Sequence, residues 1–149
     1  MFYPPNVTNK TDFFREPTHF DLLEKTLVPA LLAARSTRVI PRLKIWSAAS
    51  SNGAEAFTIA IVLAELAAYR RHFEFSVLGT DISSEMISEA RTAIYPAGMI
   101  DPVPEALQRK YFMRGRDTNS SPKVRVTPEL RNKVHFSILN CHFSTDFNV

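Results

Sequence analysis

The segment at residues 43–57 constrains the fold of this chain more than any other part of it. It begins with an apolar run at residues 43–48, continues as a turn of very small residues, and ends in the start of an apolar helix. This order is typical of a buried strand followed by a crossover helix. Small residues in the turn allow a flat ligand to approach the backbone at the carboxyl end of the strand. A strand, turn and helix without any ligand is the plainer alternative.

A second apolar run, at residues 74–80, follows the helix predicted at residues 54–71 and leads directly into Asp81. An acid in this place can hold ribose hydroxyls. Together the two units predict one half of a nucleoside-binding α/β fold. A third core strand is predicted at residues 134–139, and strands that alternate with helices indicate a parallel sheet with right-handed crossovers.

The turn also indicates which nucleoside fits. A dinucleotide site usually has three glycines there, so that the backbone and a helix N-terminus can meet a pyrophosphate, but this turn contains only Gly53. Glu55 follows the turn, and its carboxylate would repel a diphosphate, whereas it can accept a hydrogen bond or face a cation. S-adenosylmethionine meets these conditions because it carries a ribose, a sulfonium and an ammonium group but no phosphate. An NAD-type oxidoreductase domain is therefore disfavoured.

The composition is that of an ordinary globular domain, because 45% of the 149 residues are hydrophobic and 22% are charged. The net charge of +3 is mild and no basic run is interleaved with aromatic residues, so nucleic acid is not a predicted partner. Cys141 is the only cysteine, which excludes an intrachain disulfide and fits a reducing cytoplasm. We expect no signal peptide and no membrane insertion, since the longest largely apolar stretch, residues 56–64, is far too short to cross a bilayer.

Four segments, taken together, resemble one known family. They are residues 9–16 (NKTDFFRE), 46–55 (WSAASSNGAE), 79–83 (GTDIS) and the Tyr-Phe pair at 111–112. In this combination the chain is similar to the CheR family, the S-adenosylmethionine-dependent methyltransferases of bacterial chemotaxis, which methylate glutamate side chains of chemoreceptors. The resemblance begins at about Val7 and runs to the C-terminus. It implies a Rossmann-like α/β methyltransferase fold, with the N-terminal half of the parallel sheet only.

The resemblance also implies which residues contact the cofactor. Asn9, Thr11 and Arg15 match the family's cofactor-contacting segment ahead of the first strand. Glu55 matches the second acid of the family's Gly-Glu-Glu-Pro-Tyr pattern, and Asp81 matches the acid that ends the second strand. Each role has an alternative: the Arg15 side chain can form a surface ion pair, Glu55 can be a first-turn acid favoured by the helix dipole, and Asp81 can cap the next helix.

Two further contacts follow near the end of the chain. Asn140 matches the Asn of the family's Asn-Leu pair near the adenine, and Cys141 holds the position of that Leu. Asn140 can alternatively be a turn residue. The chain departs from the family pattern where Ala54, Ala56 and Phe57 replace Glu, Pro and Tyr.

The implied chemistry needs no general base, because a substrate glutamate with a pKa of about 4.3 is already ionised at neutral pH. Catalysis would then consist of holding methyl and carboxylate in line and excluding water, and no catalytic residue is assigned. The four histidines lack metal-ligand spacing with an acid or the cysteine, so no metal is expected. Trp46, Phe13 and Phe14 are predicted to lie in the core.

The remaining elements can be placed more coarsely. A helix is predicted to start at Thr18 and to kink at Pro29. Ser83 or Ser84 is predicted to cap a helix that runs to about Ala93. Further along, we expect a helix at 105–110, a mobile polar loop at 116–122, a short strand at 123–127 and a helical turn at 128–130.

Residues 1–42 are expected to lead into a partial cofactor-binding domain at residues 43–149. The leading hypothesis is the cofactor half-site of a protein-glutamate O-methyltransferase that acts on the cytoplasmic domain of a chemoreceptor. The alternative is a catalytically inactive cofactor-binding or protein-interaction domain of the same fold. Because family members continue with further strands and a small β-subdomain that docks receptor tails, the chain is expected to be a fragment or the product of a truncated gene. One edge of the strand at residues 43–48 would then be uncovered and prone to self-association.

Overall fold

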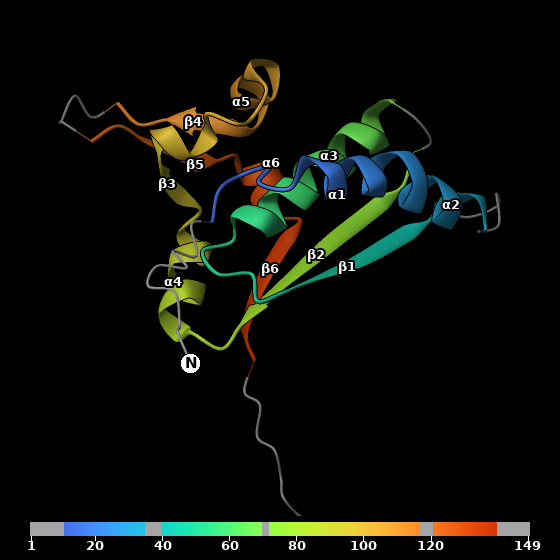
Figure 1. Cartoon of the computed structure of the whole chain (residues 1–149), viewed down its shortest axis with the longest axis horizontal. Helices are drawn as coiled ribbons and strands as arrows, with labels where there is room; N and C mark the ends of the chain where they lie inside the picture. The colour runs from blue at the N-terminus through green and yellow to red at the C-terminus, as the bar shows by residue number, and fades with distance from the viewer. Residues whose placement is uncertain (1–10, 35–39, 70–71, 117–120, 140–149) are drawn as a thin grey trace, which may run out of the picture.

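The computed structural model describes residues 11–34, 40–69, 72–116 and 121–139 of the 149-residue chain. Its main sheet has three parallel strands in the order β1-β2-β6 (Figure 1). These strands are β1 (Arg42–Ala48), β2 (Glu74–Asp81) and β6 (Val134–Ile138). The sequence predicted all three to within one residue at each end and predicted that they are parallel.

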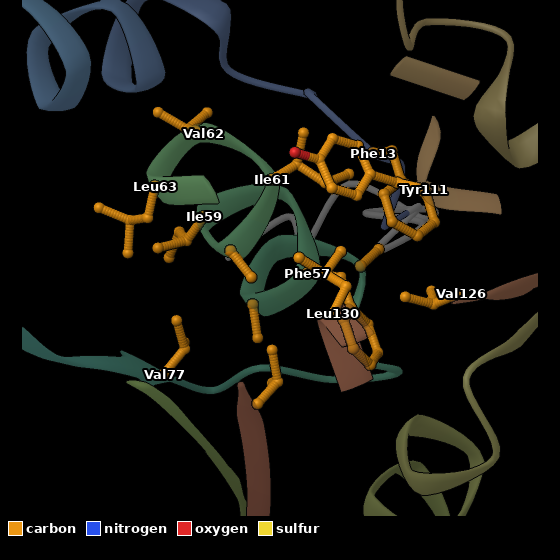
Figure 2. Close-up of a cluster of buried hydrophobic side chains, with 14 of the residues drawn as sticks. Phe13, Phe57, Ile59, Ile61, Val62, Leu63, Val77, Tyr111, Val126 and Leu130 are labelled. Atoms are coloured by element: carbon orange, nitrogen blue, oxygen red, sulfur yellow. The ribbon is translucent and has the colours of Figure 1, made fainter. Parts of the chain in front are cut away.

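Two helices connect the strands of the main sheet. Helix α3 (Ala54–Tyr69) joins β1 to β2 and packs against β2 and β6, and α4 (Ser84–Thr92) leads from β2 toward β6 and contacts both of these strands. Apart from Glu55, every residue in the first half of α3 is buried, and the side chains of this half take part in the cluster of buried hydrophobic residues that Figure 2 shows. Ser83 caps α4 as predicted, because its Oγ accepts a hydrogen bond from the Met86 N–H at 3.2 Å.

The chain ahead of β1 covers the outer side of α3. Phe13 is fully buried and forms edge-to-face contacts with Tyr95 and Phe112 at centroid distances of 5.0 and 5.2 Å. The next residue, Phe14, has φ of 53° and its N–H donates to Thr58 Oγ1 at 3.2 Å, so the two phenylalanines point to different parts of the interior. Both predicted core positions are therefore confirmed, with Phe14 packed at the margin of the core.

The helix predicted from Thr18 begins one residue earlier and has three parts. They are α1 (Pro17–Leu22), the π-helical η1 (Leu23–Leu27) and α2 (Val28–Ala33). The irregularity expected at Pro29 takes the form of this π-helical turn, in which the Val28 N–H bonds to the Leu23 carbonyl. A proline has no N–H for the carbonyl four residues earlier and its ring crowds that carbonyl, so a wider turn just before it relieves the clash.

A second sheet was not predicted. It is antiparallel, has the order β3-β5-β4, and joins β3 (Ile94–Pro96), β4 (Phe112–Arg114) and β5 (Lys123–Val126). The connecting segments contain η2 (Ala97–Ile100) and α5 (Glu105–Tyr111), and α6 (Pro128–Arg131) follows β5. Of the three strands of this sheet, the sequence predicted only the one at residues 123–127. The polar loop predicted at 116–122 lies largely outside the described residues.

Helix α5 is fastened to α3 by a polar cluster. The Glu65 carboxylate accepts hydrogen bonds from Lys110 Nζ and Tyr111 Oη, both at 2.6 Å. Burial alone would raise the pKa of Glu65, but these two donors outweigh it and leave that pKa below its ordinary value. Burial and the hydrogen bond to Glu65 raise the pKa of Tyr111 to about 12. Tyr111 and Phe112 are both buried, so the Tyr-Phe pair is a packing element.

The prediction for Trp46 was wrong. Its side chain is 63% exposed and lies in register with Leu78, which is 42% exposed, on the face of the main sheet turned away from α3. Its indole N–H donates to Thr80 Oγ1 at 2.9 Å. A strand position alone cannot tell which face of the sheet is covered, and in the described part of the chain both crossover helices pack on the other face. Strand β1 is also the edge of this sheet.

Candidate functional site

The turn after β1 has an unusual backbone. Ala49 and Ser51 have φ of 53° and 50°, and Gly53 has φ of 88°. Left-handed conformations are costly for residues with a Cβ and cluster at functional sites when the surrounding structure imposes them. Here the constraint is visible, because the Ser50 N–H between the two strained residues donates to the Thr80 carbonyl of β2 at 2.8 Å. The turn is thereby held at the carboxyl ends of both strands.

Gly53 is required by packing as well as by its backbone conformation. A Cβ at this position would lie 2.7 Å from Phe136 Cζ, and one at Gly79 would lie 2.7 Å from two other atoms of the same ring. Both glycines therefore make room for the Phe136 ring. The single glycine in the turn, taken from the sequence as an argument against pyrophosphate binding, has a structural purpose of its own.

Asp81 ties the turn to the start of α4. Its Oδ2 accepts a hydrogen bond from the Ser51 N–H and its Oδ1 accepts one from the Ser83 N–H, both at 2.9 Å. Asp81 therefore also has the alternative role at the start of α4, although the N-cap residue itself is Ser83. Each carboxylate oxygen has a second lone pair, so the geometry also leaves acceptors for ribose hydroxyls.

Glu55 lies in the first turn of α3, where the helix dipole favours a negative charge. Its Oε1 accepts a hydrogen bond from Ser47 Oγ, a buried side chain of β1, at 2.9 Å. This bond orients an otherwise exposed carboxylate. Both sequence readings of Glu55, as a first-turn acid and as a group able to face a cation, agree with this position.

The small sheet supports the same turn from behind. Tyr95 of β3 donates its hydroxyl hydrogen to the Asn52 carbonyl at 2.7 Å, and burial raises the pKa of this tyrosine well above its ordinary value. The phenol therefore stays protonated and keeps donating over the whole physiological range. No feature of the sequence pointed to this contact, because β3 has only three residues and its pairing is set by distant parts of the chain.

A cavity of about 880 Å³ opens in front of the turn. All four predicted cofactor residues that the structure describes line it: Thr11, Arg15, Glu55 and Asp81. Asn9, Asn140 and Cys141, predicted for the same site, lie outside the described residues. Among the other lining residues are six that the sequence reading did not assign to the site: Ser50, Ser51, Ile59, Met86, Leu22 and Leu27.

The side chains around this cavity suit S-adenosylmethionine. Glu55 and Asp81 supply carboxylates for an ammonium group and a ribose, Arg15 supplies a guanidinium for a carboxylate, and the leucines of α1 and η1 form an apolar wall. Ser50 Oγ is buried at the cavity and has no hydrogen-bond partner among the described residues, as expected of a group that a ligand satisfies. Within those residues no group of three or more His, Cys, Asp or Glu could hold a metal ion, and no helix is long and apolar enough to cross a membrane.

A parallel sheet with a strained turn after its first strand and an acid after its second defines a Rossmann-like nucleoside-cofactor domain. The sequence model described as "CheR methyltransferase, SAM binding domain" matches residues 9–149, and the chain belongs to this family. The expected resemblance, the fold class and S-adenosylmethionine as the cofactor of this domain are thereby confirmed.

Several curated proteins are similar to the chain. A chemotaxis protein methyltransferase of Borreliella burgdorferi is 38% identical over 134 residues, which is 89% of this chain and 46% of that protein. Chemotaxis protein methyltransferase 2 of Pseudomonas aeruginosa is 37% identical over 141 residues, 94% of this chain and 47% of the relative. The Escherichia coli chemotaxis protein methyltransferase is 38% identical over 135 residues, 90% and 43% of the two chains. The chain thus spans about half the length of the curated relatives it matches.

Proposed function

We propose that the cavity in front of the strained turn binds S-adenosylmethionine and that the chain carries the cofactor half-site of a protein-glutamate O-methyltransferase. In this proposal Arg15 holds the methionyl carboxylate through its guanidinium fork, Glu55 faces the ammonium group, and Asp81 accepts hydrogen bonds from the ribose hydroxyls. One observation carries the proposal: residues from three separate segments of the sequence, each implied by the family resemblance as a cofactor contact, line the same cavity. Asn9, Thr11, Asn140 and Cys141 are proposed as further contacts.

The proposed reaction is methyl transfer to glutamate carboxylates of a chemoreceptor's cytoplasmic domain, as the names of the relatives suggest. The cofactor supplies an electrophilic methyl group on a sulfonium. The acceptor carboxylate is ionised at neutral pH, so the residues of this chain need only orient the cofactor and keep water out. Helix α1 and η1 serve the second purpose, because their leucines form one wall of the cavity.

Isothermal titration with S-adenosylhomocysteine tests the binding step. Asp81→Ala is a poor probe, because it would also remove two hydrogen bonds that hold the turn. Glu55→Gln is better, since an amide oxygen can still accept from Ser47 while the negative charge is lost. We expect at least a tenfold weaker affinity for Glu55→Gln and no change for the control Glu105→Gln, an exposed acid paired with Arg109. Equal affinities of wild type and Glu55→Gln would overturn the assignment of Glu55.

The alternative, an inactive cofactor-binding or interaction domain, differs in one measurable respect. If the chain is active, S-adenosylmethionine with a labelled methyl group will transfer the label to a chemoreceptor cytoplasmic fragment in a base-labile ester. Binding without any transfer would support the alternative for this chain.

We also propose that the small antiparallel sheet docks a receptor tail, which is the role that the family resemblance gives to a small β-subdomain. Among the described residues its outer strands β3 and β4 each pair only with β5, so each offers an edge to an added strand. The domain would act in the cytoplasm, with residues 1–42 leading into the cofactor-binding part at residues 43–149. Retention of the chain by an immobilised receptor C-terminal peptide, and its loss when β3 is altered, would test the docking.

We also propose that the chain self-associates through the open edge of β1. Within the described ranges no strand pairs with the outer side of β1, where Trp46 is exposed, and such an edge is a template for pairing with another chain. Light scattering at rising protein concentration is expected to show a growing dimer fraction. A stable monomer at the highest concentration would contradict this proposal.

A further inference from the structure

A second, smaller cavity is separate from the cofactor cavity and is lined by residues of α3, α4, α6 and β6. Its volume is about 260 Å³ and its walls are Phe57, Ala90, Arg91, Arg131, Val134, His135 and Phe136. Two arginines from different helices thus meet at one small cavity, and its lining contains no acid. Nothing in the proposed methyl transfer uses this place.

The two guanidinium groups are in different states. Arg91 is held by a hydrogen bond from Nη2 to the Phe136 carbonyl at 3.0 Å. Arg131 has a buried Nε–H without any hydrogen-bond partner in the described part of the chain, and no ion pair is found there for either arginine. A buried, charged donor without a partner is costly, and a second cation at the same cavity adds repulsion.

We propose that this cavity binds a phosphate-type oxyanion, held between Arg91 and Arg131. A tetrahedral oxyanion supplies the acceptor that the Arg131 Nε–H lacks and neutralises both cations, and the guanidinium fork matches its oxygen spacing. The cavity volume of about 260 Å³ is just below the range of about 300–1,000 Å³ that is typical of ligand pockets, so a phosphoryl group has room in it. The group comes either from free phosphate or from the end of a larger phosphorylated molecule.

The site has a structural connection to the cofactor turn. The Phe136 carbonyl accepts the Arg91 hydrogen bond, and the Phe136 ring fills the space that Gly53 and Gly79 leave open. An oxyanion at the arginines would therefore lie beside the strand that supports the turn. It would not enter the cofactor cavity, because the two cavities share no lining residue.

Thermal denaturation in inorganic phosphate, compared with sodium chloride of equal ionic strength, tests the proposal. The wild-type chain is expected to melt at a higher temperature in phosphate, and Arg131→Gln is expected to lose this difference. Arg109→Gln, which removes an exposed arginine on α5, is the matched control and should keep it. In chloride, Arg131→Gln should be at least as stable as wild type, because the unpartnered buried Nε–H is gone.

Titration calorimetry then gives the affinity. Phosphate should bind Arg131→Lys at least tenfold more weakly than wild type, since lysine keeps the charge and loses the fork; this variant also replaces Arg131→Gln if that one fails to fold. Phosphate binding should persist when S-adenosylhomocysteine saturates the cofactor cavity. Because the two sites are separate, a failure to bind phosphate would not count against the proposed methyl transfer. Weaker binding of O-phosphoserine than of phosphate would identify the free ion as the ligand, and the reverse would identify a phosphorylated molecule. Equal melting temperatures of wild type in phosphate and chloride would overturn the proposal.

Discussion

Replacing Gly53 by alanine tests why the strained turn needs a glycine at this position. Two separate effects should lower the free energy of unfolding. A residue with a Cβ at φ of 88° is in a backbone region that costs about 1–2 kcal/mol. The new Cβ would also lie 2.7 Å from Phe136 Cζ and 3.0 Å from Ala90 Cβ.

The Phe136 ring cannot move aside easily. It already rests on Gly79, where the nearest approach of an added Cβ would also be 2.7 Å, and on Phe57 at a centroid distance of 5.5 Å. Overpacking of this kind costs about 1–3 kcal/mol. The free energy of unfolding should therefore fall by about 2–5 kcal/mol, out of a total of about 5–15 kcal/mol for a domain.

Urea denaturation of the ligand-free chain measures this change. Gly98→Ala is the control, because a Cβ there meets only Asp101 Oδ2 at 3.9 Å and lies in a helical turn, so its effect should be close to zero or stabilising. The double variant Gly53→Ala with Phe136→Leu separates the two costs, since the smaller side chain relieves the clash and leaves the backbone cost. A loss below 1 kcal/mol for Gly53→Ala, or simple additivity in the double variant, would refute the packing argument.

Four other predictions concern stability. Phe13→Ala should lower the free energy of unfolding by about 3–5 kcal/mol, because a fully buried ring with two edge-to-face partners is removed; thermal denaturation measures it, and a loss under 1 kcal/mol would show that the N-terminal segment is not part of the core. Asp81→Ala should destabilise the chain by about 2–4 kcal/mol even without cofactor, since two backbone N–H groups lose a charged acceptor; an unchanged urea midpoint would argue against those bonds. The lowered pKa of Glu65 means that its stabilising effect is complete above the unfolded value of about 4.3 and disappears as the pH falls through the folded value, so Glu65→Gln should flatten the acid limb of a stability–pH curve. Because the pKa of Tyr111 is raised to about 12, its stabilising effect is complete below about pH 10 and is lost as the pH rises from about 10 to 12. Tyr111→Phe should remove this alkaline loss of stability.

The sequence by itself determined the elements whose signals are local. The strands β1 and β2 appear as short runs rich in apolar residues, and their buried side chains largely alternate because one face of the sheet packs against helices. Ser83 marks the start of α4 because a cap is satisfied within one turn. The acids Glu55 and Asp81 were assigned to one site because the carboxyl ends of neighbouring parallel strands meet at one edge of the sheet. These inferences need only the period of the pattern and the topology rules.

Only the tertiary structure decided the features that depend on distant partners. The three-residue strands β3 and β4 are too short to have a periodicity of their own and exist because β5 pairs with both. Trp46 is exposed because the described helices cover the other face of its sheet, which no single strand can reveal. Gly53 is needed because Phe136 arrives from the far end of the chain, and Arg91 meets Arg131 only after α4 and α6 have packed beside β6. Local patterns record which elements form, whereas the contacts between elements depend on distances that only the folded chain defines.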